Sequence, residues 1–264
     1  VRAPLGPEIH QHGLVRADFE IEKKADNSPL TIADRKSHAI IAGWLADTPY
    51  PILSEEGKKI PTEERQSWKE LWVVDPLDGT KEFIKRNGEF TVNIAYVKNG
   101  APEAGVIYIP VKEELFFADI EKGAYKLSNE DGLLTRINEN KEQGCTLETL
   151  IEKAQKLPYP TPHEGFMIVA SRSHLNAETE EYIERMKKEH AKVETVSKGS
   201  SLKLCLIAEG VADVYPRFAP TMEWDTAAGH AIIRAAGKEV YQANTDKPLV
   251  YNKEDLLNPW FIAK

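Results

Sequence analysis

The pattern of apolar and polar residues changes along the chain and divides it into two unlike halves. Residues 90–127 are rich in strand-forming residues, and polar and apolar positions alternate over 91–96. Asn99-Gly100, which follows, is a dipeptide typical of tight hairpin turns. Further apolar stretches occur at 104–110 and 114–120. The pattern therefore predicts an antiparallel meander in the first half.

Upstream of the meander, the pattern predicts one helix and one short strand. Apolar residues recur near the helical period from Ile32 to Leu45, so we expect a helix that begins near Thr31 and ends before Pro49. Residues 51–54 predict a short buried strand, and 62–70 a polar connection with a helical turn. Alternation over 19–22 predicts an extended segment, and residues 1–15, which lack a helical period, are left out of the fold prediction.

In the second half, predicted strands alternate with predicted helices. Strands are expected at 166–171, 191–197 and 212–218, and helices at 176–190, 200–210 and 225–237. This alternation is typical of an α/β sheet covered on its faces. The charged and then proline-rich stretch 138–162 is a candidate inter-domain region. We therefore predict an N-terminal α+β half, 1–132, and a C-terminal α/β half, 133–264.

Composition narrows the class of protein. A formal net charge of −8 argues against a nucleic-acid polymer as partner, although a small anionic substrate remains compatible with it. Two cysteines are too few for a disulfide framework, which favours a reducing compartment. No apolar run is long enough for a transmembrane helix, and no signal peptide is evident. We expect a cytoplasmic protein, or one peripheral on the inner face of the membrane.

Two carboxylates occur where the apolar run 71–74 ends. Asp75 and Asp78 are separated by Pro76, which stiffens the turn, and by Leu77, whose carbonyl we expect to point outward. Carboxylate and carbonyl oxygens are hard ligands that suit Mg²⁺ better than Zn²⁺. The alternative is that Asp78-Gly79 is an ordinary turn dipeptide and that Asp75 is a polar strand end.

Acidic residues lie at two further junctions. Glu55 and Glu56 follow the strand predicted at 51–54, and Asp225 precedes a helix rich in small residues. Taken singly, the glutamates could be a solvated pair and Asp225 a helix N-cap. Because burying charge without a partner is costly, three acidic junctions together favour a shared cation.

Several short segments together resemble a known family. "DPLDGTKEF" (75–83), "SEE" (54–56) and "WDTAAG" (224–229), in this order, resemble the lithium-sensitive, magnesium-dependent phosphatases of the inositol monophosphatase superfamily. "KADNSPLTIAD" (24–34), "GSSLKLCLIAEG" (199–210) and "YPRF" (215–218) resemble its 3′(2′),5′-bisphosphate nucleotidase branch, of the bacterial CysQ type. The likeness covers about residues 16–264. Residues 1–15 depart from it, because the branch normally opens with an amphipathic helix.

The resemblance implies a layered α/β/α/β/α sandwich of the sugar-phosphatase type. It implies that Glu55, Asp75 and the Leu77 carbonyl hold one Mg²⁺, and that Asp75, Asp78 and Asp225 hold a second. A third ion could bind with help from Glu56 through water. Two such ions can clamp the attacking and leaving oxygens of a phosphoryl transfer.

The resemblance also assigns catalytic and substrate residues. It pairs Asp34 with the Thr80 hydroxyl to activate the attacking water, where the plain alternatives are a surface acid and a helix N-cap. Gly79 and Thr80 would offer backbone N–H groups to the phosphate. The implied nucleotide contacts also include residues that could instead be ordinary loop, helix or strand-edge polar groups, namely His174, Ser200, Lys203, Arg217 and Asp225.

The activity implied is hydrolysis of the 3′-phosphate of adenosine 3′,5′-bisphosphate (PAP) to AMP and phosphate, which clears a by-product of sulfur assimilation. The corresponding sulfonucleotide, PAPS, is a second expected substrate. The alternative enzymes are an inositol-1-monophosphatase and a fructose-1,6-bisphosphatase, but "DGTKEF" favours the nucleotidase over the more usual "DGTTNF" of inositol enzymes. A metal-dependent binding module without turnover is a second class, and the pairing of Asp34 with Thr80 argues against it. A two-metal nuclease is a third class, and the net charge of −8 argues against it. We expect a monomer or homodimer.

Overall fold

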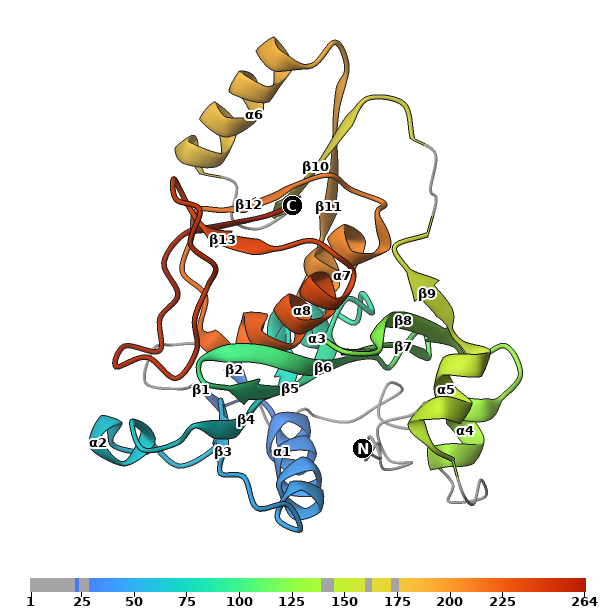
Figure 1. Ribbon diagram of the computed structural model, residues 1–264, viewed down its shortest axis with the longest axis vertical. Helices are drawn as coiled ribbons and strands as arrows, with labels where there is room; N and C mark the ends of the chain where they lie inside the picture. Colours follow the sequence, from blue (N-terminus) through green and yellow to red (C-terminus); the bar gives the residue numbers. More distant parts are fainter. Residues whose placement is uncertain (1–21, 24–28, 139–144, 160–162, 172–175) are drawn as a thin grey trace.

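A large mixed sheet forms the centre of the molecule in the computed structural model, which describes residues 22–23, 29–138, 145–159, 163–171 and 176–264 (Figure 1). Its strand order is β3-β4-β5-β6-β7-β8-β9, in which β3 runs parallel to β4 and every other neighbouring pair is antiparallel. The predicted meander and the hairpin at Asn99-Gly100 are confirmed. The strands are β3 (Ile52–Ser54), β4 (Glu70–Asp78), β5 (Thr91–Lys98), β6 (Ala101–Ile109), β7 (Glu114–Asp119), β8 (Gly123–Ser128) and β9 (Gln155–Leu157).

Both faces of this sheet are covered by helices, and the sequence of β4 is accordingly apolar on both faces. Leu71 and Val73 pack with α7 and α8 on one face, while Trp72 and Val74 pack with α1 on the other. Successive strand residues point to opposite faces, so a strand buried on both sides must be continuously apolar. The covering helices are α1 (Ile32–Leu45), α4 (Leu133–Asn138) and α5 (Leu147–Lys153) on one side and α7 (Leu202–Glu209) and α8 (Glu223–Ala235) on the other.

Beyond α7 and α8 lie two smaller sheets, with α6 (Ala177–Glu189) on the far side (Figure 1). The strands β10 (Phe166–Ser171) and β11 (Val193–Lys198) are parallel, and β14 (Phe261–Ala263) lies between β12 (Tyr215–Arg217) and β13 (Val240–Gln242). Helices therefore alternate with sheets through the molecule. The α/β fold class predicted from the sequence is confirmed.

The remaining elements are short. The strands β1 (Glu22–Lys23) and β2 (Pro29–Leu30) pair with each other, and α2 (Thr62–Arg65) and α3 (Thr80–Ile84) are single turns or little more. The extended segment predicted at 19–22 lies mostly outside the described residues.

Two sequence predictions need correction. The stretch 138–162 is not simply a connection, because it contains α5 and β9, whose apolar residues dock on the large sheet. The strands β13 and β14 were not predicted, since three-residue strands carry too little periodicity to be recognised. The boundary at 132/133 stays a prediction, and β9, which lies beyond it, pairs with β8 of the first sheet.

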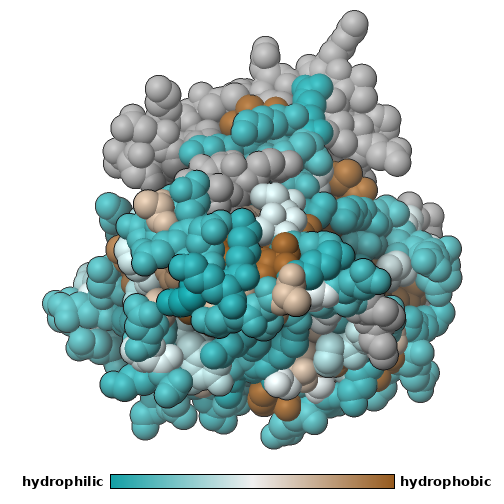
Figure 2. Space-filling model, turned by 90° about the horizontal axis from the view of Figure 1, so that it is seen from above, coloured by the Kyte–Doolittle hydropathy of each residue, from teal (hydrophilic) through white to brown (hydrophobic). Residues whose placement is uncertain are grey.

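The surface is largely hydrophilic on the side seen in Figure 2, where hydrophobic side chains form only small patches. Within the described ranges, no helix combines the length and apolar character needed to cross a lipid bilayer.

Candidate active site

A β-bulge at the end of β4 brings its two aspartates together. Asp75 is opposite Asn93 on β5 and Asp78 is opposite Thr91, so two residues, Pro76 and Leu77, face a single partner position. In a regular strand, residues three apart point to opposite faces. The extra residue restores the parity, so both carboxylates reach the same side. Proline is tolerated here because a bulge does not need its N–H.

Hydrogen bonds hold the bulge in place. The Leu77 N–H donates to Asp75 Oδ1 at 3.0 Å, and the Ser37 hydroxyl on α1 donates to the Pro76 carbonyl at 2.8 Å. Because Asp75 is only 1% exposed and Ser37 4%, water has little access to these bonds. Whether the Leu77 carbonyl serves as a ligand stays a prediction.

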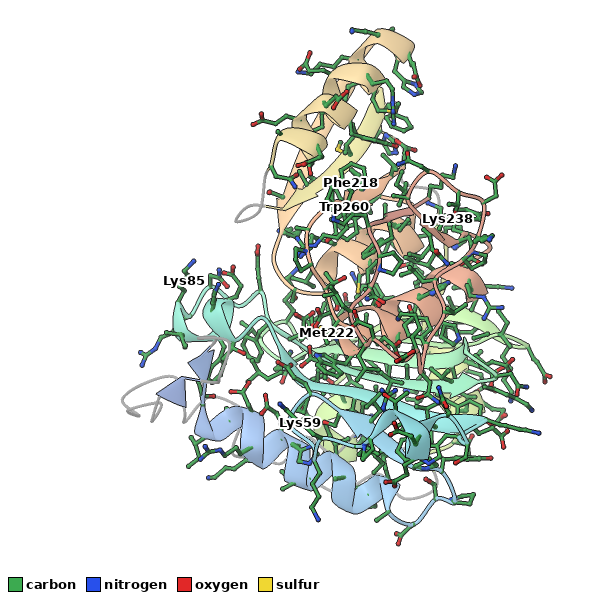
Figure 3. All side chains as sticks on the ribbon, turned by 90° about the vertical axis from the view of Figure 1, so that its left-hand side faces the viewer. Lys59, Lys85, Phe218, Met222, Lys238 and Trp260 are labelled. Carbon is green, nitrogen blue, oxygen red and sulfur yellow. The ribbon has the colours of Figure 1, made fainter. Side chains whose placement is uncertain are left out.

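Helix α8 supplies the third aspartate. Asp225 is not the N-cap but the third residue of the helix, and its Oδ2 accepts the Met222 N–H at 2.7 Å. Figure 3 shows Met222 close to the large sheet, where α8 begins. Helix α8 packs close to α7 because its facing residues are small: a Cβ on Gly229 would lie 2.4 Å from the Leu204 side chain on α7. The small residues of "WDTAAG" thus serve packing that puts Asp225 at the site.

Oxygen atoms of Asp75, Asp78 and Asp225, hereafter the carboxylate cluster, all lie within 4.8 Å of one another. Burial, followed by the charge of Glu55, raises the pKa of Asp75 well above its ordinary value. Burial, followed by the charge of Asp78, raises the pKa of Asp225 to about 8. In the part of the chain that the structure describes, no lysine or arginine forms an ion pair with these three residues. Such a cluster favours protons or a cation.

The glutamates predicted at the site lie beside this cluster. Glu55 follows β3, the parallel neighbour of β4, and its N–H donates to the Val74 carbonyl at 3.1 Å. Its oxygens are not among those within 4.8 Å, although its charge raises the pKa of both Asp75 and Asp225. Glu56 is half-buried next to it.

Asp34 and Thr80 come together although they are 46 residues apart. The Thr80 hydroxyl donates to Asp34 Oδ1 at 3.2 Å, while Asp34 Oδ2 accepts the Thr31 N–H at 2.8 Å and its hydroxyl at 2.5 Å. Asp34 is 2% exposed, so it is not a surface acid, and Thr80 is the first residue of α3 rather than its N-cap. A buried carboxylate that holds a hydroxyl beside the bulge is placed to act on a proton there.

Gly79 is required by the backbone. Its φ of +90° is strained for any residue with a Cβ, and a Cβ would lie 3.2 Å from that of Ser200 and 3.3 Å from the Glu89 carbonyl. The glycine thus lets the β11–α7 segment approach α3 closely.

Two predicted substrate residues carry polar atoms without partners. Among the described residues, the buried side-chain atoms that lack a hydrogen bond are Ser200 Oγ, Arg217 Nε and Asn93 Oδ1. Buried polar atoms are almost always satisfied, so an unsatisfied hydroxyl and an unsatisfied guanidinium N–H are typical of a ligand site. Ser200 is also strained, with φ +43°.

Lys203, which is predicted to contact the nucleotide, is buried and hydrogen-bonded within the protein. Its Nζ donates to the Ser200 carbonyl at 2.6 Å, and burial lowers its pKa to about 8. The lysine therefore supports the strained segment. His174 lies outside the described residues.

Comparison with known proteins shows the family of this chain. The model of the inositol monophosphatase family matches residues 8–260. The chain belongs to this family. It is 45% identical to the 3′(2′),5′-bisphosphate nucleotidase CysQ of Shigella flexneri over 92% of the chain and 88% of that protein. The crystal structure of CysQ from Bacteroides thetaiotaomicron matches with a TM-score of 0.85 and 61% identity, covering 95% of this chain and 88% of that one.

A more distant family member shares the fold alone. An IMPase of Thermotoga maritima matches with a TM-score of 0.62 and 22% identity, over 92% of this chain and 82% of that one. The identity to the CysQ proteins of Shigella flexneri and Bacteroides thetaiotaomicron confirms the resemblance to the CysQ type that the motifs indicate.

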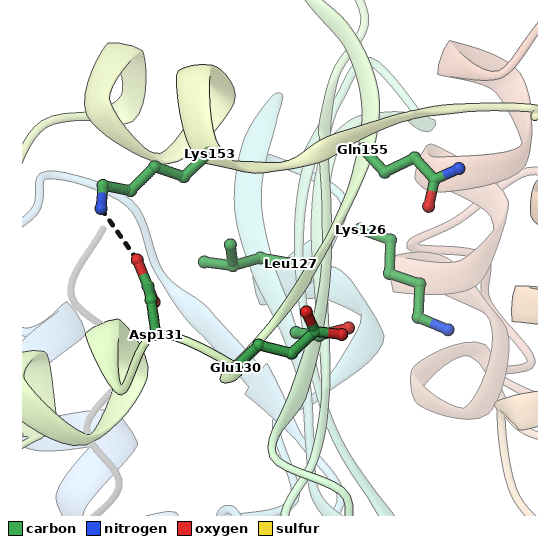
Figure 4. Close-up of a pocket in the computed structure, with 7 residues that line it drawn as sticks. Lys126, Leu127, Glu130, Asp131, Lys153 and Gln155 are labelled. Carbon is green, nitrogen blue, oxygen red and sulfur yellow. Dashed lines mark hydrogen bonds and ion pairs between the residues drawn. The ribbon is translucent and has the colours of Figure 1, made fainter.

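A separate cavity lies elsewhere in the fold. It has a volume of about 380 Å³ and is lined by residues of β8, the turn after it, α5 and β9 (Figure 4). Its two lysines are already paired, Lys153 with Asp131 at 2.8 Å and Lys126 with Glu209 at 2.8 Å. Of the predicted site residues that the structure describes, none lines this cavity.

Two residues that touch the cluster were not predicted from the sequence. Ser201 and Asn93 both hydrogen-bond to Asp78. Asn93 is an amide side chain in the middle of the buried strand β5, which is the pattern that could have identified it.

Proposed function

We propose that the protein hydrolyses the 3′-phosphate of adenosine 3′,5′-bisphosphate to AMP and phosphate, and that it also acts on PAPS. The names of the CysQ relatives support a nucleotide bisphosphate as substrate. The observation that carries the proposal is that a cluster of carboxylates lies near polar groups without hydrogen-bond partners. These groups are Ser200 Oγ and Arg217 Nε, which have no partner among the described residues. The charge of Arg217 also acts on Asp225, where it lowers the pKa of the carboxyl.

The donor set of the cluster fits hard divalent cations. The three clustered side chains offer carboxylate oxygens, which Mg²⁺ prefers, and their closely spaced charges need a cation. Glu55, Asp75 and the Leu77 carbonyl would hold one Mg²⁺, and Asp75, Asp78 and Asp225 a second, with a third near Glu56. When bound, such ions supply Lewis-acid stabilisation of the charge that develops on the phosphoryl oxygens.

Asp34 and Thr80 would handle the proton of the attacking water. Because the Thr80 hydroxyl already donates its hydrogen to Asp34 Oδ1, its lone pairs are free to accept a hydrogen bond from water. Asp34, anchored on Thr31, can then draw the proton through Thr80 Oγ as attack begins. A module that only binds would not need this pair.

Arg217 and Ser200 would bind the phosphate that is not hydrolysed. The guanidinium N–H at Nε is buried without a partner among the described residues, while one terminal nitrogen donates to the Pro220 carbonyl at 3.1 Å. This leaves a fixed fork for phosphate oxygens. Lys203, whose ammonium also holds the Ser200 carbonyl, would contact the nucleotide together with His174 and the Gly79 and Thr80 N–H groups. We further propose two structural halves, 1–132 and 133–264, that work as a cytoplasmic monomer or homodimer.

Phosphate release from a substrate panel tests the function. With Mg²⁺ present, we expect the highest kcat/KM for adenosine 3′,5′-bisphosphate among that compound, inositol 1-phosphate, fructose 1,6-bisphosphate and AMP. Preference for inositol 1-phosphate or fructose 1,6-bisphosphate would instead establish the alternative activity.

Arg217→Ala tests the second-phosphate contact. We expect KM for adenosine 3′,5′-bisphosphate to rise by about tenfold or more, because a charge-assisted contact is lost. KM for adenosine 3′-monophosphate should change far less. Arg185→Ala, which removes an arginine that stacks on Tyr182 of α6, is the matched control. Equal effects of Arg217→Ala on both substrates would refute the assignment.

A further inference from the structure

The segment that begins α7 departs from ordinary helix chemistry at Ser201. A serine at an N-cap normally accepts a hydrogen bond from the N–H of the second or third helical residue. Ser201 is the N-cap of α7, yet its side chain makes no such bond. A local preference given up at a buried position indicates that the group is used elsewhere.

The Ser201 hydroxyl is used at the carboxylate cluster. Its Oγ lies 2.6 Å from Asp78 Oδ2 and 2.9 Å from the Asp225 carbonyl oxygen, and it accepts the Asn93 side-chain N–H at 2.9 Å. Ser201 is 3% exposed and Asn93 1%, so solvent cannot substitute for these bonds. One hydroxyl thus joins residues of β4, β5 and α8 to the start of α7.

The single hydroxyl proton has two possible acceptors, and the carboxylate is the stronger one. Asn93 adds a second N–H to Asp78 Oδ2 at 3.3 Å, and the Thr91 hydroxyl lies at 3.4 Å from the same oxygen. All these bonds end on Oδ2. Asp78 Oδ1 therefore remains available, within the described part of the chain, for an ion.

We propose that Ser201 and Asn93 are a positioning pair that fixes the Asp78 carboxylate for divalent cations. The proposal rests on the proposed function in taking the cluster as the metal centre. The pair orients one oxygen of Asp78 and keeps α7, with the neighbouring Ser200, docked against β4 and β5. Outer partners of ligating carboxylates commonly affect metal affinity by about 10–100-fold.

The experiment measures Mn²⁺ binding to the full-length, metal-free protein by electron paramagnetic resonance, without substrate. We expect Ser201→Ala and Asn93→Ala each to weaken the tighter Mn²⁺ association by about 10–100-fold. The double variant should be little worse than either single one, because the two residues act as a unit. Ser197→Ala, which removes a hydroxyl bonded only to the Ala170 carbonyl in the preceding strand, should bind Mn²⁺ like the parent.

A kinetic measurement separates positioning from general support of the fold. In both variants kcat at low Mg²⁺ should fall and should recover toward the parent value at high Mg²⁺, with KM for the bisphosphate unchanged at saturating metal. Circular dichroism and thermal melting verify folding, and Asn93→Ala serves if Ser201→Ala does not fold.

Parental Mn²⁺ affinity in a folded variant would overturn the proposal, as would additive effects of the two substitutions. Because the Mn²⁺ titration contains no substrate, its result does not depend on which phosphate ester the protein hydrolyses.

Discussion

Two carboxylates, those of Glu223 and Asp225, lie two residues apart on α8 and have opposite surroundings. Glu223 is fully buried, and its oxygens accept the Asn252 N–H at 2.6 Å, the Lys253 N–H at 3.0 Å and the Lys253 ammonium at 2.5 Å. We call these three residues the Glu223 brace. Asp225 shares the cluster with Asp75 and Asp78, where each negative charge opposes the others.

The difference separates structural from functional acids. The protein itself satisfies the Glu223 brace, which ties the start of α8 to the C-terminal segment. The same segment also holds the buried Arg65 through its backbone carbonyls. Within the described residues, no lysine or arginine pairs with the carboxylate cluster. Repulsion among its charges therefore destabilises the folded protein when no cation is bound. An acid paired with a cationic group of the protein is evidence about stability, and a cluster of acids without such a group is evidence about function.

The largest expected effect comes from Asp75→Asn. Because Asp75 is the proposed bridging ligand, we expect kcat to fall at least about a thousandfold while the protein stays folded. Steady-state assays with Mg²⁺ and thermal melting provide the measurements. Asp119→Asn, which also alters an aspartate at a strand end, should keep parental activity. Near-parental activity of Asp75→Asn would remove the distinction between the two sets of acids.

Glu223→Gln should act on stability instead. Loss of the charge leaves the Lys253 ammonium poorly compensated, so the free energy of unfolding should fall by about 3 kcal/mol. Activity well below the melting temperature should change less than tenfold. Denaturant unfolding measures the loss, and Glu254→Gln, at the exposed neighbour of Lys253, is the control. If Glu223→Gln abolished turnover without destabilising the protein, Glu223 would belong to the active site.

The pH dependence of stability gives the smallest effect and the sharpest contrast. The raised pKa of Asp225 means that the metal-free folded protein binds a proton more tightly than the unfolded chain. Its contribution to stability is therefore present below about pH 4 and is lost as pH rises through about 8. We expect the free energy of unfolding to fall by about 1–2 kcal/mol from pH 5 to pH 8 in EDTA.

Asp225→Asn should flatten this dependence and raise stability at pH 8, although it removes a proposed ligand. Unfolding by denaturant at several pH values makes the comparison. If the free energy of unfolding depended on pH as it does in the parent, Asp225 would not be the group responsible for that dependence.

The elements were largely predictable because local chemistry specifies them. The helix from Ile32 to Leu45 begins at its Thr31 cap, and the hairpin turns at Asn99-Gly100, as expected from the sequence. The strands β13 and β14 were not predicted, since they are too short for a pattern and form only by pairing with β12 and with each other.

The site was predictable only where motifs carried it. The acids at 75, 78 and 225 were named from their positions at element ends, and Asp34 and Thr80 only through the family resemblance. Ser201 and Asn93 escaped notice, because a buried serine or asparagine has no meaning until its neighbours are known.

The sequence by itself determined the order of helices and strands, the oxygen character of the candidate ligands and the family, since these depend on residues close together in the chain. Tertiary structure decided which oxygens meet. A one-residue bulge sets the parity of Asp75 and Asp78, and the close approach of α8 across small side chains brings in Asp225. Packing between distant segments, which no local pattern encodes, turns separate acids into one charged site.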